Sequence, residues 1–95
     1  MDQETFRFVK DSVKRELFDD HRARVLRTAV DAGARFDCDQ ARELVSCFTF
    51  GSGQVEAAVV LHPRVVDPIR FEHVLDVFTF ESDKDRARRA IRSAR

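Results

Sequence analysis

The sequence predicts an all-α fold, a compact bundle of about six short helices built from helix–turn–helix units with a period of about 30 residues. Apolar residues recur at three- and four-residue spacing, as they do on one face of a helix. No window alternates strictly between apolar and polar residues, and no hairpin turn pair such as Asn-Gly occurs. A phenylalanine also comes just before a predicted helix three times, at Phe18, Phe50 and Phe80, which indicates a helical repeat.

A single domain over residues 1–95 is expected, because a chain of 95 residues can bury a core without disulfides or metal. Its aromatic residues are nine Phe, with no Trp or Tyr. Phe carries no polar group, so these rings are predicted to fill the core and the turns, and not to form a wet stacking surface. Eight of them are expected to supply most of this packed mass: Phe6, Phe18, Phe36, Phe48, Phe50, Phe71, Phe78 and Phe80.

Charge and cysteine content restrict the function classes. Seventeen Lys and Arg residues balance seventeen Asp and Glu residues, so no net charge draws the chain onto nucleic acid or an anionic membrane. Two cysteines, Cys38 and Cys47, are too few for a disulfide framework. No signal peptide opens the chain, and the longest apolar run, residues 57–61, is too short to cross a bilayer. We expect a cytoplasmic protein with free thiols and no membrane span.

The first two helices are predicted over residues 2–18 and 20–33. The first carries one apolar face at helical spacing. The second starts after Asp19 and Asp20, which can cap it. Gly33 is predicted to end it, because glycine accepts the left-handed conformation in which helices stop.

The third and fourth helices are the best-marked elements. Asp37 and Gln40 match a capping box at the start of the third helix. The fourth helix is predicted to start at Ser52 and to end near residue 61. It is apolar nearly all round, which is typical of a buried central helix.

The remaining third of the chain is predicted to hold two more helices. The valine pair at residues 65–66 is expected to tuck inward as a short connector. Asp67 and Pro68 then start the fifth helix, because a capping residue followed by proline favours a helix N-terminus. Ser82 and Asp85 form a looser capping box for the last helix.

Four stretches, which together cover nearly the whole chain, resemble one known family. They are the helix from Phe6 to Phe18, the helix start at residues 36–40, the link at residues 48–50, and the segment 65–71 followed by residues 78–80. In order and spacing they resemble the domain of unknown function numbered 4476, a small helical module. The resemblance implies the helical fold and brings no catalytic motif. Many members resemble modules attached to longer, sometimes exported, proteins, whereas this chain is expected to have neither a leader nor an extra region.

No catalytic residue, cofactor or metal site is predicted. The two cysteines and three histidines show no CxxC, HxxxH or HExxH spacing, and no window matches an EF-hand loop. The acidic clusters coincide with predicted helix starts, where capping accounts for them. Cys38 lies at a helix N-terminus, which lowers the pKa of a thiol, but Asp37 and Asp39 beside it raise that pKa. We therefore expect a semi-exposed, unreactive thiol and not a nucleophile paired with a histidine.

Six cations in the last twelve residues form the one candidate binding face: Lys84, Arg86, Arg88, Arg89, Arg92 and Arg95. They surround a helix whose inner stripe is mostly alanine, which predicts a helix that undocks easily. Such a face can dock nucleic acid, anionic lipid or an acidic partner. The alternative, which we favour, is a solvated helix whose cations interact well with its own C-terminus. No aromatic residue is interleaved with these cations, which disfavours single-strand binding in particular.

The sequence favours a non-catalytic protein-interaction or scaffold module, with another protein as its partner. The alternative is a nucleic-acid- or anion-binding domain that uses the basic C-terminal helix. That alternative requires Arg22, Arg24 and Arg27 of the second helix to join the last helix in one contiguous face. An enzyme would require a pocket that gathers Cys38 or a histidine with a perturbed carboxylate.

Overall fold

The structure confirms the prediction of an all-α fold with six helices. The computed structural model describes residues 1–94, in which the only β-type pairing is one isolated bridge. Six α-helices follow one another: α1 (Gln3–Arg15), α2 (Asp19–Asp31), α3 (Cys38–Ser46), α4 (Gly51–Leu61), α5 (Glu72–Leu75) and α6 (Glu81–Ser93). Two single 3₁₀ turns, η1 (His62–Arg64) and η2 (Pro68–Arg70), lie between α4 and α5.

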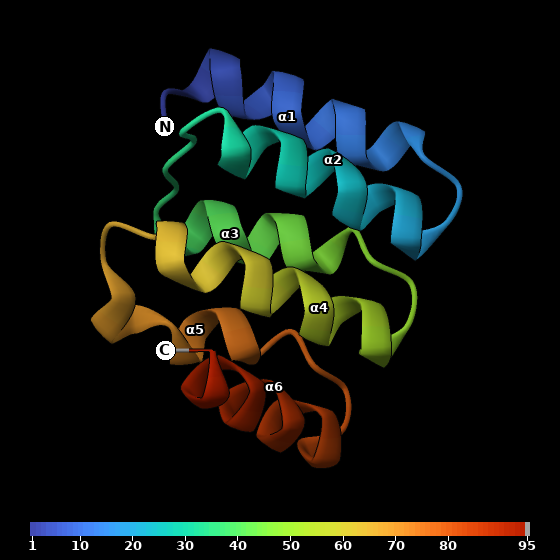
Figure 1. Ribbon diagram of the computed structural model, residues 1–95, viewed down its shortest axis with the longest axis vertical. Coiled ribbons are helices and arrows are strands. Elements are labelled where there is room, and N and C mark those ends of the chain that lie inside the picture. The colour runs from blue at the N-terminus through green and yellow to red at the C-terminus, as the bar shows by residue number, and fades with distance from the viewer. Residues whose placement is uncertain (95) are drawn as a thin grey trace.

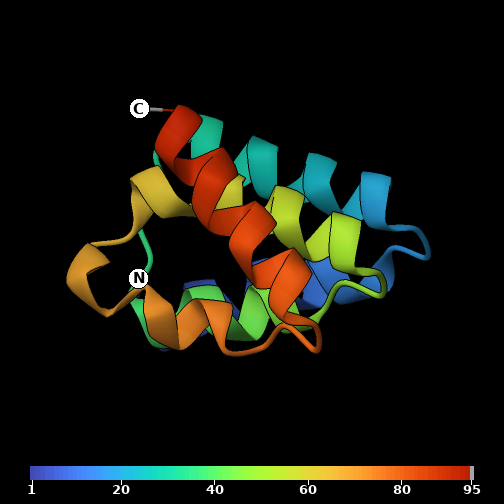
Figure 2. The same cartoon turned by 90° about the horizontal axis from the view of Figure 1, so that it is seen from below.

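The helices form three successive pairs stacked in two layers. α1 pairs with α2, α3 with α4, and α5 with α6 (Figure 1). Seen from below, α2, α4 and α6 make up one layer, and α1, α3 and α5 make up the other (Figure 2). In the first layer α4 packs between α2 and α6, and in the second α3 packs between α1 and α5. The turns that join the two helices of each pair therefore lie along one edge of the molecule, on the right of Figure 1.

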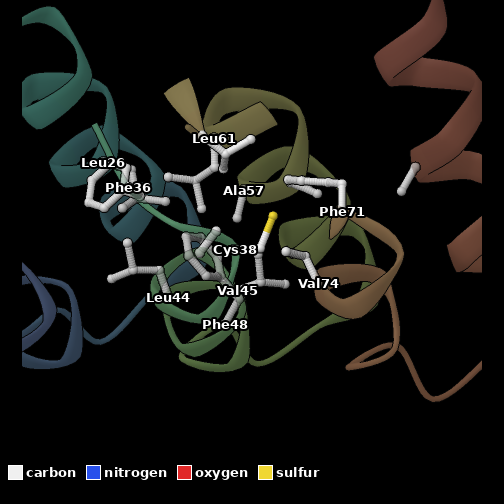
Figure 3. Close-up of a cluster of buried hydrophobic side chains, with 14 of the residues drawn as sticks. Leu26, Phe36, Cys38, Leu44, Val45, Phe48, Ala57, Leu61, Phe71 and Val74 are labelled. Carbon is white, nitrogen blue, oxygen red and sulfur yellow. The ribbon is translucent and has the colours of Figure 1, made fainter. Parts of the chain in front are cut away.

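The core lies between the two layers. Leu26, Phe36 and Leu61 are fully buried in it (Figure 3). α4 is the central helix, as predicted, because it contacts α2, α3 and α6. α6 buries two side chains, Ala87 and Ile91, whose burial stabilises its docking by about 3 kcal/mol.

A short backbone pairing joins the two linkers between the helix pairs. The amide of Phe36 donates to the carbonyl of Arg64 at 2.9 Å, and the amide of Val66 donates to the carbonyl of Phe36 at 2.9 Å. Val65 faces the core, as predicted, but Val66 is exposed. The extended backbone at this bridge explains the difference, because successive side chains of an extended segment point to opposite faces.

The strongest local signals in the sequence are confirmed. Asp37 and Gln40 form the predicted capping box, with the amide of Gln40 donating to the Asp37 carboxylate at 2.8 Å and the amide of Asp37 donating to the Gln40 side chain at 3.0 Å. Gly33 has a φ of 94° just after α2, where a side chain would be strained. The amide of Ala34 then donates back to the carbonyl of Ala29, which satisfies the end of the helix.

The predicted fifth helix is wrong in its first turn. Pro68 starts the 3₁₀ turn η2, and the α-helix runs only from Glu72 to Leu75. Asp67 does not cap this segment. Its carboxylate instead accepts a hydrogen bond from the amide of Cys38, at 2.9 Å, so a side chain expected to start one helix satisfies the N-terminus of another.

The predicted caps of three other helices are also wrong. The N-cap residues of α2, α4 and α6 are Phe18, Phe50 and Phe80, and none of them makes a side-chain capping hydrogen bond. Each has an extended backbone, and its carbonyl accepts a hydrogen bond from the amide four residues later. Ser52 and Ser82 consequently lie within the first turn of their helices.

Phe18, Phe50 and Phe80 are exposed, which corrects the prediction that they are packed in the core and the turns. Their extended backbone follows the end of one helix and carries the side chains away from the interface between the layers. Phe48 and Phe78 come two residues earlier, just after the ends of α3 and α5, and both side chains are buried. The amide of each donates to the carbonyl three residues before it, so the backbone still curls back toward the core at these positions. The other predicted core phenylalanines are buried: Phe6, Phe36, Phe48, Phe71 and Phe78.

Two glycines in the first turn of α4 allow the neighbouring helices to approach closely. A Cβ atom at Gly53 would lie 2.7 Å from the Cγ atom of Asp19 in α2. A Cβ atom at Gly51 would lie 2.8 Å from the Cγ atom of Asp83 in α6. Both separations are far below a normal van der Waals contact, so a side chain at either position would force the facing aspartate to move.

Cys38 is fully buried, which corrects the expectation of a semi-exposed thiol. Its side chain points into the core beside Val74 (Figure 3). The Sγ atom donates to the carbonyl of Asp67 at 3.1 Å. Burial first, and the side chain of Asp67 second, raise the pKa of the thiol to about 12. Cys38 is therefore held as a neutral core residue, whereas Cys47 is partly exposed.

We predict that Gly53→Ala lowers the free energy of unfolding by about 1–2 kcal/mol, although alanine favours a helix by about 1 kcal/mol, because the clash with Asp19 costs more. Urea unfolding measures the change. Ser52→Ala is the matched control: Ser52 is exposed between the two glycines, and its replacement should change stability by less than about 0.5 kcal/mol. A Gly53→Ala protein as stable as the wild type would contradict the close approach.

We predict that a maleimide labels Cys47 in the folded protein and labels Cys38 only after unfolding. The thiolate is the reacting form, and burial with a raised pKa keeps Cys38 protonated. Mass spectrometry of peptides from protein labelled with and without urea gives the answer. Equal labelling of both cysteines without urea would show that the core around Cys38 opens readily.

Candidate functional site

The structure gives carboxylate partners to half of the predicted basic face. Lys84 contacts Asp76 at 2.8 Å. Arg88 contacts Glu72 at 2.7 Å and Asp85 at 2.6 Å. A third cation, Arg86, lies 3.6 Å from Asp83. Arg89 and Arg92 are exposed, and Arg95 lies outside the described residues. The charge of this helix is thus partly neutralised by its own and neighbouring acids.

The arginines of α2 do not join those of α6 in one face. α4 lies between the two helices. Arg27 pairs with Glu56 of α4. Arg22 pairs with Asp19 near the turns at the molecular edge, and only 13% of its side chain is exposed. Two of the three predicted arginines of α2 are therefore paired with carboxylates, and the third, Arg24, is exposed.

Potential catalytic groups are dispersed. His21, His62 and His73 lie on α2, η1 and α5, and the Cys38 thiol is held by a main-chain carbonyl in the core. Among residues 1–94, no three His, Cys, Asp or Glu side chains come together in a group able to hold a metal ion. No helix in the described part of the chain is long and apolar enough to cross a membrane.

A row of exposed apolar side chains follows the edge where the three helix pairs turn. We call it the Phe edge: Leu17, Phe18, Phe50 and Phe80. Their exposed fractions are 80%, 61%, 69% and 65%. The first helix was predicted to reach residue 18, but α1 ends at Arg15 and leaves Leu17 in the turn. The edge brings together residues from three turns that are separate in the sequence (Figure 1).

The three phenylalanines occupy equivalent positions. Each is the N-cap of its helix, with φ between −110° and −124° and ψ between 136° and 152°. Sequence reasoning recognised the recurrence of Phe but assigned it to the core. The N-cap position of these phenylalanines could have indicated a different role. An N-cap favours Ser, Thr, Asp or Asn and disfavours large apolar residues.

The carboxylate of Asp19 fixes two of these turns against each other. One oxygen accepts from the amide of Thr49 at 2.9 Å, and the other accepts from the amide of Phe50 at 2.9 Å. The guanidinium of Arg22 pairs with Asp19 at 2.7 Å and also donates to Thr49 Oγ1 at 2.8 Å. Arg22 further donates to the carbonyl of Glu16 at 3.1 Å. The turn before Phe18 is thereby tied to the turn before Phe50.

These contacts set the protonation state of Asp19. Burial alone would raise its pKa, but the amides of Thr49 and Phe50 together with Arg22 outweigh burial and lower the pKa below its ordinary value. Asp19 is therefore ionised at neutral pH. Because the folded-state pKa is depressed, the stability that the carboxylate contributes is present above the unfolded-state pKa and is lost as the pH falls through the folded-state pKa.

We predict that Asp19→Asn lowers the free energy of unfolding by about 2 kcal/mol at neutral pH, because it removes the charge from hydrogen bonds to two amides and a guanidinium. The difference from the wild type should be constant above the unfolded-state pKa of about 3.9 and should shrink below it. Urea unfolding of both proteins from pH 7 down to about pH 2.5 tests this linkage. A difference that does not change over that range would contradict the role of the ionised carboxylate.

Comparison with known proteins agrees with the helical architecture. No curated protein and no solved structure matches the chain. Residues 1–91 match the model of the family described as a domain of unknown function, DUF4476. This match spans all six helices up to the last turn of α6. The chain therefore belongs to the DUF4476 family.

Proposed function

We propose that this domain is a non-catalytic protein-interaction module, and that the Phe edge is its contact surface. The observation that carries the proposal is the exposure of Phe18, Phe50 and Phe80 at three helix N-caps. Phenylalanine is a poor capping residue, and at these positions it buries little in its own core. Neither capping nor core packing accounts for its presence three times, whereas binding does.

The dimensions and chemistry of the Phe edge suit a peptide segment or a helix of another protein. Neighbouring packed helices lie about 8–10 Å apart, so the starts of α2, α4 and α6 span about 20 Å. Successive apolar residues on a bound amphipathic helix, seven positions apart, lie about 10 Å apart. Aromatic side chains supply much of the binding energy at protein interfaces because they bury a large area with few rotatable bonds.

The edge is held rigid before a partner arrives. Asp19 binds the α3–α4 turn, and α4 packs against both α2 and α6. Each phenylalanine is attached to the first turn of a packed helix and not to a long loop. A surface fixed in this way loses little conformational entropy on binding. We interpret the three helix pairs as a structural repeat in which each pair contributes one aromatic contact.

Binding of protein is favoured over binding of nucleic acid by the charges near the edge. Phenylalanine rings can stack on bases, but Lys84 and Arg88, two of the cations of α6 that would accompany them, are paired with carboxylates. Exposed carboxylates, Asp20 and Glu81, directly follow Phe18–Asp19 and Phe80. These acids would repel a phosphate backbone or an anionic membrane surface.

We predict that changing Phe18, Phe50 and Phe80 together to serine abolishes binding without lowering stability. Serine is a better N-cap than phenylalanine, so the free energy of unfolding should stay constant or rise by up to about 1 kcal/mol per site. Affinity capture from a lysate of the native host identifies proteins retained by the wild type. Titration of the purified captured protein should then show affinity at least about tenfold weaker for the triple variant.

The matched control changes three exposed apolar residues away from the edge, Phe8, Val66 and Ile69, to serine. This control should bind like the wild type. Equal binding by the edge variant and the wild type would overturn the assignment of the Phe edge. Concentration-dependent dimerisation of the wild type, measured by sedimentation and lost in the edge variant, would identify a second copy of the chain as the occupant.

A further inference from the structure

A basic pocket of about 500 Å³ lies between α1 and α3, next to the Phe edge. Four cations line it: Lys10, Lys14, Arg22 and Arg42. One carboxylate, that of Glu43, faces them. The four cations come from three helices and are scattered along the sequence, so only the fold brings them together.

The pocket keeps a positive surplus after its internal contacts are formed. Lys10 pairs with Glu43 at 2.9 Å, which accounts for the one lining carboxylate. Arg22 is likewise paired with Asp19 at 2.7 Å. Arg42 donates to the main-chain carbonyl of His73 at 2.9 Å, a neutral group, so Arg42 and Lys14 carry the surplus. Lys14 is exposed at the mouth of the pocket. Cations held close together around a partly desolvated space attract an anionic group strongly.

Arg22 connects this pocket to the Phe edge. Its guanidinium lines the pocket and contacts Thr49, which directly precedes Phe50. It also donates to the carbonyl of Glu16, two residues before Phe18. Arg22 therefore links the pocket to the turns that carry Phe18 and Phe50.

We propose that the pocket binds an acidic side chain, Asp or Glu, of the partner segment that docks on the Phe edge. This proposal depends on the proposed function and specifies its partner: an apolar segment that carries carboxylates on one side. The edge is electrically asymmetric, because three of the four pocket cations, Lys10, Lys14 and Arg42, lie on the layer of α1 and α3. Asp20 and Glu81 lie on the layer of α2 and α6. This asymmetry sets the orientation of the bound segment as well as its charge.

A peptide is favoured over a lipid surface as the source of the anionic group. An anionic membrane facing the Phe edge would meet the carboxylates Asp20 and Glu81 together with the cations of the pocket. A single peptide segment can place its acids toward Lys10 and Lys14 and its neutral or basic residues toward those carboxylates. Charge complementarity thus selects a narrow, asymmetric occupant.

The test is selection from a library of random 16-residue peptides displayed on phage, with the full 95-residue chain as bait. Peptides that bind the wild type but not the serine variant of the Phe edge should be enriched in apolar residues together with Asp and Glu. A synthetic peptide from this set should bind the Lys10→Glu/Lys14→Glu variant about tenfold more weakly or worse. Changing the peptide's critical acid to lysine should restore binding to that variant and weaken binding to the wild type.

The matched control is Arg35→Glu/Arg89→Glu, which makes the same change in net charge at two exposed residues outside the pocket. It should bind the peptide like the wild type. Edge-dependent peptides without acidic enrichment, or with equal affinity for the Lys10→Glu/Lys14→Glu variant, would overturn the pocket assignment and leave the proposed function standing. A selection that gives no edge-dependent peptide would overturn both. Stronger binding to vesicles of anionic lipid than to any selected peptide would also overturn the assignment to a peptide.

Discussion

The carboxylate of Asp19 is the interaction on which the arrangement of the other parts depends. It lies at the start of α2, yet it satisfies the amides of Thr49 and Phe50 at the start of α4. A charge buried to this extent is stabilising only when it is fully paired and hydrogen-bonded, and Arg22 completes that pairing. Gly53 leaves the space that the carboxylate fills. The same contacts tie the turn before Phe18 to the turn before Phe50, and Arg22 also lines the basic pocket. The fold and the candidate site therefore depend on the same interactions.

Asp67 acts in a similar way, and the two residues explain where sequence reasoning succeeds and fails. Asp37 was correctly predicted as a cap because its partner amide lies three residues away. Asp19 and Asp67 carry the same local signal, but their carboxylates serve the N-termini of helices that come about 30 residues later or earlier in the chain. Propensity describes a residue and its neighbours in sequence. It contains no information on a helix start that the fold brings alongside, and for this reason the start predicted for the fifth helix at Asp67 and Pro68 is wrong.

The number and order of the helices, the glycine stop at Gly33 and the central position of α4 were all predictable, because each follows from helical periodicity or from one backbone preference. The exposure of Phe18, Phe50 and Phe80 was not recognised, since composition suggested that every Phe was core. The buried phenylalanines Phe48 and Phe78 come only two residues before exposed ones. A boundary shift of one or two residues therefore exchanges core and surface, and helix boundaries are the least certain part of any sequence prediction.

Net charge misled in a comparable way. A total of zero indicates no global attraction to polyanions, yet the fold distributes the charges unevenly. Acids pair with three cations of α6, whereas Lys10, Lys14 and Arg42 converge on a space that contains one carboxylate. The fold thus partly neutralises the cations of the predicted basic face, whereas it brings the cations of the pocket together. The stability of the helices does not require positive charges to converge beside exposed aromatic rings. Recognition of a segment that is both apolar and acidic requires both features, and this is why we assign the Phe edge and the pocket to one binding surface.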